Sequence, residues 1–132
     1  MRRFLFLIAI VVCPLVLRAE LPPSVYEARQ KSAPELLNIE ILRVEIEPGD
    51  APERQNVRIM ALVNKVTRTA TDVKEGGLIN IFYTVTARQN GWAGPGEIPI
   101  LEEKDKTVAY LTKVEASDEY APAAGAMTFR NF

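Results

Sequence analysis

Hydrophobic and polar residues alternate along three long segments of the chain, and a period of two predicts β-strands. The first segment begins at Leu36. Its apolar residues share one face only if one position is skipped after the third of them: Leu37, Ile39, Ile41, Val44 and Ile46. Such a skip is what a β-bulge or a strong bend produces. A turn at residues 48–52, with two prolines and a glycine, ends this strand.

Two further segments show the same alternation. The strand predicted from Val57 to Thr67 carries Val57, Ile59, Ala61 and Val63 on one face. Val66 falls out of phase, which predicts a second bulge. The strand predicted from Leu78 to Arg88 aligns Ile79, Ile81, Tyr83, Val85 and Ala87. The pair Gly76 and Gly77 supplies the backbone freedom for the turn that precedes it.

Shorter elements flank these strands. Pro22 and Pro23 open a helix that runs to Ser32, and the pair Ser24 and Glu27 predicts a capping box at its start. So short a helix is marginal alone, so we expect it to dock on the body through Val25 and Tyr26.

Beyond residue 96, two short strands are predicted at Ile98–Leu101 and Thr107–Val114, and Phe129 is expected to pack back on the body. Five strands, two of them long and bent, with one short helix predict a mainly β fold: a small, closed or nearly closed barrel. A flat sandwich is the alternative, although seven strands are hard to find.

The first nineteen residues are typical of an export signal. Arg2 and Arg3 precede an apolar run of fourteen residues, Phe4–Leu17, and Leu17–Ala19 offers a cleavage site. The run is shorter than the roughly twenty residues of a spanning helix. We therefore predict a signal peptide at 1–19 and a single domain at 20–132, secreted or periplasmic. An uncleaved anchor and lipid attachment at Cys13 stay open as alternatives.

Cleavage changes the composition of the chain. It removes three of sixteen basic residues and none of the seventeen acidic ones, leaving a net charge of −4. It also removes Cys13, the only cysteine, so the mature domain forms no disulfide. A mildly acidic domain is a poor partner for nucleic acid.

The segment Val57–Val85 resembles an OB-fold barrel: a long strand, the linker Thr71–Gly77, and an immediate apolar strand, Leu78–Tyr83. Within that class, the export signal, the long first strands and the loop around Trp92 are similar to netrin-like modules, the family of the tissue inhibitors of metalloproteinases. The resemblance implies a five-stranded barrel that binds another protein. Those inhibitors use an N-terminal cysteine and several disulfides, which residues 20–132 lack, so their mechanism is not implied.

The residues needed for most catalysis are missing. The chain has no histidine, and its three serines lie in no nucleophile elbow. No glycine-rich phosphate loop occurs. Carboxylates cluster at residues 102–105 and 118–119, but lysines interleave with the first cluster, which is typical of solvated turns. We predict a protein that is not an enzyme and uses no cofactor or metal.

The loop at residues 90–96 is the main candidate for a binding surface. A lone tryptophan, Trp92, follows Gly91 and precedes Pro95. Such a ring either plugs the end of the barrel or is exposed to a partner, where aromatic anchors dominate binding energy. The hypothesis is that Trp92, Gly91, Pro95 and Tyr120 form part of a ligand surface.

A second candidate, the segment Val66–Thr71 with Lys65 and Arg68, would suit a single-stranded nucleic acid. The aromatic rings needed for stacking, Phe82 and Tyr83, fall on opposite faces of their strand, so this hypothesis is not favoured. The prediction is an exported binding or assembly module for a protein or envelope component, with no membrane contact after cleavage. An inhibitor of an extracytoplasmic enzyme acting through a loop is the alternative. A carboxylate-dependent enzyme or a sugar binder is third.

Overall fold

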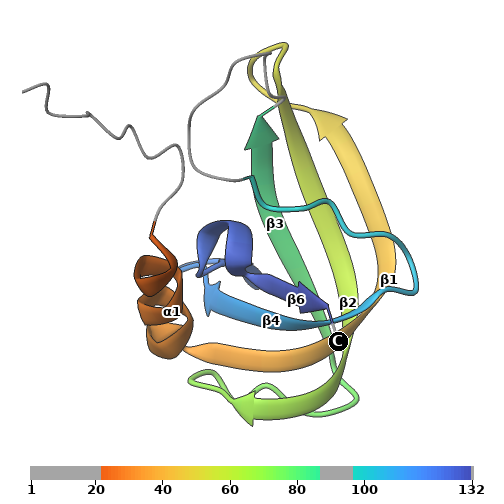
Figure 1. The fold of residues 1–132 in the computed structure, drawn as a ribbon. Helices are drawn as coiled ribbons and strands as arrows, with labels where there is room; N and C mark the ends of the chain where they lie inside the picture. The colour runs from red at the N-terminus through yellow and green to blue at the C-terminus, as the bar shows by residue number, and fades with distance from the viewer. Residues whose placement is uncertain (1–21, 87–96, 132) are drawn as a thin grey trace, which may run out of the picture.

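The computed structural model describes residues 22–86 and 97–131, and its strands close into a barrel. The strands are β1 (Glu35–Pro48), β2 (Arg54–Arg68), β3 (Leu78–Thr86), β4 (Lys106–Lys113), β5 (Glu119–Pro122) and β6 (Phe129–Asn131). They pair in the order β1–β2–β3–β5–β4–β6, and β4 also pairs with β1, which closes the five strands β1–β5 into the barrel. The pairing of β3 with β5 is parallel. The predicted class, a mainly β, OB-like barrel of five strands with one short N-terminal helix, is confirmed (Figure 1).

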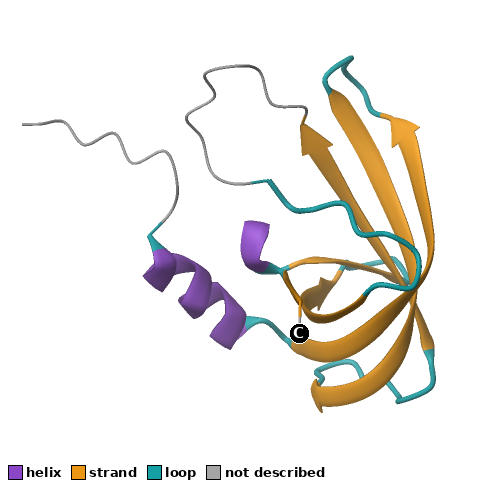
Figure 2. Ribbon diagram, turned by 45° about the vertical axis from the view of Figure 1, so that its right-hand side comes forward, coloured by secondary structure: helices purple, strands orange, loops and turns teal. Residues whose placement is uncertain are grey.

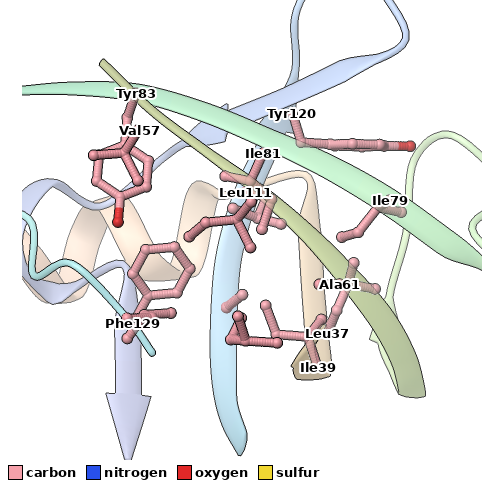
Figure 3. Packing of buried hydrophobic residues seen from close by; sticks show 14 of the residues in the cluster. Leu37, Ile39, Val57, Ala61, Ile79, Ile81, Tyr83, Leu111, Tyr120 and Phe129 are labelled. Carbon is pink, nitrogen blue, oxygen red and sulfur yellow. The ribbon is translucent and has the colours of Figure 1, made fainter. Parts of the chain in front are cut away.

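The alternating residues predicted from the sequence fill the barrel. Ile39, Ile59, Ile81 and Leu111 are at most 1% exposed, and they come from four different strands. Figure 3 shows the rings of Tyr83 and Phe129 close together beside the aliphatic side chains. Their centroids are 6.0 Å apart and their planes are tilted by 48°. Phe129 therefore packs back on the body, as predicted.

Register shifts occur where the sequence skips a position. Ile41 pairs with Ala61 and Arg43 with Met60, so Leu42 is the extra residue of a bulge. Two more shifts lie near Val66, which pairs with Leu37. Both predicted bulges are confirmed. They bend β1 and β2 enough for β1 to pair with β2 and β4 at once, which closes the barrel.

The predicted helix is confirmed as α1 (Pro23–Ser32), and its buried side chain is Tyr26. The predicted capping box is wrong, because the N-cap residue is Pro22 and no side chain caps the helix. Pro23 occupies the first helical position, so Ser24 already has helical geometry and cannot act as N-cap. The other end of α1, its C-terminus, is held by Arg68, whose guanidinium donates to the carbonyl oxygens of Gln30 and Ala33 at 2.8 and 2.9 Å.

The strand predicted at Ile98–Leu101 is wrong, because this segment is irregular. It crosses the sheet as a loop (Figure 2). Pro99 has no N–H to donate to a ladder, and its carbonyl oxygen accepts a hydrogen bond from the Tyr83 hydroxyl at 2.7 Å. The fifth barrel strand is β5, which replaces the one predicted there. Within the described ranges, no helix is long and apolar enough to cross a membrane.

Candidate binding face of the barrel

The outward side chains of β1, β2 and β3 form a continuous face, which we call the β1–β3 face. Registers align its members in two rows across the strands: Arg43, Met60 and Asn80 in one, and Glu45, Arg58 and Phe82 in the next. Side chains alternate along a strand, so these residues point away from the core that their neighbours fill. A groove of about 190 Å³ lies on this face and is lined by residues of both rows.

Arg58 is the most constrained cation of the β1–β3 face. Its guanidinium forms an ion pair with Glu119 of β5. The same group lies 5.2 Å from the centroid of the Phe82 ring, which is cation–π geometry. Arg43 pairs with Glu45 at 2.6 Å along β1. Both arginines are more than half exposed, so their ion pairs add little stability and leave donors facing solvent.

A second hollow of about 280 Å³ adjoins this groove, and Asn80 lines both. Its wall is formed by the loop before β3, by Lys113 and Asp118 around the β4–β5 turn, and by Tyr120. Leu78, which is 61% exposed, lies at its rim. Two larger hollows each lie under a single turn, at residues 113–118 and 46–55. Because the groove and the hollow at Asn80 bring several strands together, they define the better candidate site.

Tyr120 is the one predicted site residue within the described ranges. It is 7% exposed and belongs to the core, and its hydroxyl lies 2.8 Å from the Thr71 hydroxyl. It nevertheless lines the hollow at Asn80, so it contributes a buried wall rather than an exposed anchor. Gly91, Trp92 and Pro95 lie outside the described residues.

The Thr71 hydroxyl also connects Tyr120 to a fully buried carboxylate. It donates to Oε1 of Glu35 at 2.9 Å, and the Ala70 N–H points to both carboxylate oxygens at 3.2 and 3.3 Å. Glu35 is 0% exposed, and among the described residues no buried side-chain nitrogen or oxygen lacks a partner. This network fixes the loop that forms one wall of the hollow, because a buried carboxylate is stable only when hydrogen-bonded.

The other charged segments noted in the sequence have structural roles. Asp105 accepts a hydrogen bond from the backbone N–H of Glu102 at 2.8 Å, which closes the turn before β4. In the nucleic-acid hypothesis Arg68 was a candidate contact, but its guanidinium holds the end of α1. Within the described part of the chain, no three acidic, histidine or cysteine side chains gather as metal ligands would.

Tyr83 has a pKa that departs clearly from the ordinary value of a tyrosine. Burial raises the pKa of Tyr83 from 10.0 to about 12, and a backbone hydrogen bond at Leu101 opposes this rise in part. The phenol therefore stays protonated at physiological pH, in its role as a donor to Pro99. This is the behaviour of a structural tyrosine rather than of a general base.

Arg58, Met60 and Phe82 are the site residues that the sequence analysis missed. The alternation that placed their neighbours in the core also places these three on the opposite side of β2 and β3. A large apolar or aromatic residue at a polar-side position was the available signal. Comparisons of the chain with protein-family models, curated proteins and solved structures give no match.

Proposed function

We propose that the protein is an exported, non-catalytic binding module that recognises a protein or an envelope component through the β1–β3 face. The observation that carries this proposal is the setting of Arg58, stacked on Phe82 and oriented by Glu119. A cation already held in one geometry loses less conformational entropy when a partner binds. Arginine, methionine and aromatic residues are also enriched where protein interfaces bury most surface.

The resemblance to netrin-like modules supports this proposal only as to the kind of partner. A barrel of this kind is consistent with that class, and the class suggests a protein as partner. The proposed location follows from the signal peptide predicted at residues 1–19. The cysteine mechanism of the metalloproteinase inhibitors is not part of the proposal, since cleavage would remove Cys13.

The proposal is tested by a photo-crosslinking amino acid, benzoylphenylalanine, placed at Asn80 of the full chain and irradiated in an envelope extract of the source cell. The expected result is one adduct of defined mass. It is lost when Leu78→Asp is added and kept when Met127→Asp is added. Leu78 and Met127 are matched controls because both are exposed, at 61% and 48%, and only Leu78 borders the site. Each variant should change stability by less than about 0.5 kcal/mol.

Three outcomes count against the proposal: no adduct at Asn80, equal labelling from the same probe at exposed Lys65, or an adduct with nucleic acid alone. If the adduct is a protease and its activity falls on binding, the proposal is supported in its inhibitor form. The adduct with any other protein or envelope component supports the assembly form.

A further inference from the structure

Beyond the bulge at Leu42, the edge of β1 that faces away from β2 carries no partner strand among the described residues. Pairing with β4 ends at Glu40 and Lys106. The next residue, Ile41, still donates its N–H to the carbonyl oxygen of Asp105 at 2.8 Å, and its own carbonyl oxygen accepts from the Lys104 N–H at 2.7 Å. From Arg43 to Pro48, β1 pairs with β2 and with no other strand of the described chain. Figure 1 shows β1, β2 and β3 continuing beyond β4. We call residues 43–48 the β1 edge.

Two residues present hydrogen-bonding groups along the β1 edge. Val44 pairs with Ile59 and Ile46 pairs with Val57. Ile59 and Val57 face the core, so Val44 and Ile46 lie on the same face of the sheet as the buried Ile41. In a strand, the side-chain face and the direction of the residue's N–H and C=O alternate together. Since Ile41 turns its backbone groups toward Asp105 and Lys104, Val44 and Ile46 turn theirs to the same side. Pro48 ends the edge because it has no N–H.

The surroundings of the β1 edge are acidic. In residues 43–54 and 102–105, seven side chains are acidic and three are basic, whereas the whole chain has seventeen acidic and sixteen basic residues. Two of the three cations already have acidic partners, since Arg43 pairs with Glu45 and Arg54 lies 3.6 Å from Asp50. A partner that lies along this edge meets net negative charge.

We propose that the β1 edge binds an extended, basic segment of a partner protein as an added strand, with basic residues opposite Glu45 and Glu47. Apolar residues of the segment then lie beside Val44 and Ile46, the latter 48% exposed. Backbone hydrogen bonds give affinity in this mode, and alternate side chains give specificity. This inference rests on the proposed function, and it names the conformation and charge of the partner.

A second copy of the chain fits this edge less well. Two β1 edges paired antiparallel would bring four glutamates together and supply two arginines, because each contributes Arg43, Glu45 and Glu47. Charged residues and a proline on an edge strand are also the usual protection against self-association. The charge pattern therefore selects a basic partner and opposes the protein's own strand.

The test uses a synthetic eight-residue peptide of alternating lysine and valine, titrated into the isotopically labelled full chain and followed by NMR. The expected result is a shift of the Val44 and Ile46 amides with slower hydrogen exchange at both. Ile46→Pro removes one edge donor while keeping the ladder to β2, and it should weaken binding about fivefold to tenfold. Ile46→Ala keeps the donor and is the matched control, with a loss of less than about threefold. A peptide with proline at two central positions should not bind.

The contribution of charge is tested by the double variant Glu45→Gln and Glu47→Gln. At low salt this variant should bind the lysine peptide more weakly than the wild type does, and at high salt the two proteins should bind it equally. The inference is overturned if Ile46→Pro binds the peptide as the wild type does. It is equally overturned if the Val44 and Ile46 amides are already protected from hydrogen exchange without peptide, because the edge is then occupied. Sedimentation would then show whether a second copy of the protein or a segment of the same chain occupies it. If the Asn80 adduct forms but is unaffected by Ile46→Pro, this inference fails and the proposed function stands.

Discussion

Tyr83 makes the stability of the barrel sensitive to alkaline pH. Its pKa is about 12 in the folded protein, against an ordinary value of 10.0 for the unfolded chain. Below pH 10 both states are protonated and the full stability is present. Between pH 10 and 12 the unfolded chain loses the phenolic proton while the folded protein keeps it, so the free energy of unfolding falls. The loss amounts to about 1 kcal/mol at pH 11 and about 3 kcal/mol well above pH 12.

The comparison of wild type with Tyr83→Phe isolates this effect, because lysines and other tyrosines titrate in both. At pH 8 the variant should be less stable by about 1 kcal/mol, the value of the hydrogen bond from the hydroxyl to Pro99. Near pH 11 the two stabilities should converge, since only the wild type has lost the contribution of the raised pKa. Urea unfolding at a series of pH values measures both. A difference that stays constant from pH 8 to pH 11 would refute the reasoning.

Two further variants test how the N-terminal helix and the loop beside the hollow are held. Arg68→Met should lower the free energy of unfolding by about 1–2 kcal/mol and raise hydrogen exchange in α1, because it removes two hydrogen bonds to the helix end. The control Lys65→Met, at an exposed position, should leave the free energy of unfolding almost unchanged. Unchanged exchange in α1 of the Arg68 variant would contradict this. Thr71→Val should cost about 1–3 kcal/mol by urea unfolding, since it takes a donor from the buried Glu35 carboxylate and a partner from the Tyr120 hydroxyl. A cost no larger than that of Thr67→Val, at an exposed position, would show that the network is not stabilising.

The barrel wall could be predicted from the sequence because alternation and bulges leave direct marks on it. The skip after Ile41 and the out-of-phase Val66 both correspond to register shifts between β1 and β2. The fifth strand was predicted in the wrong place. Within residues 98–101, Leu101 is buried and Ile98 packs on the core, whereas Ile100 is 39% exposed. A loop can place two such side chains on the core as well as a strand does. β5 is only four residues long, too short for a pattern to predict.

The candidate site was harder to predict, because its residues meet only after the barrel closes. Arg58 and Glu119 are 61 positions apart, and their pairing depends on β3 and β5 lying side by side. Glu35 gives no local signal of its burial either. A glutamate at the start of a strand is usually exposed, and this one is enclosed because the loop after β2 returns to donate to it.

The structure also explains why β1 is part of the barrel wall in its first half and, within residues 22–86 and 97–131, has no second partner strand at residues 43–48. Ile39 and Ile41 are each 1% exposed, whereas Ile46, on the same face beyond the bulge, is 48% exposed. The alternation of β1 is similar in both halves, so β1 itself does not determine the difference. It is determined by the turn before β4, where Asp105 accepts from the Glu102 N–H and Lys104 adopts a left-handed φ of 73°. This turn directs the chain away after its bonds to Ile41, so β4 pairs with the first half of β1 and, among the described residues, no strand pairs with Val44 and Ile46 on that side.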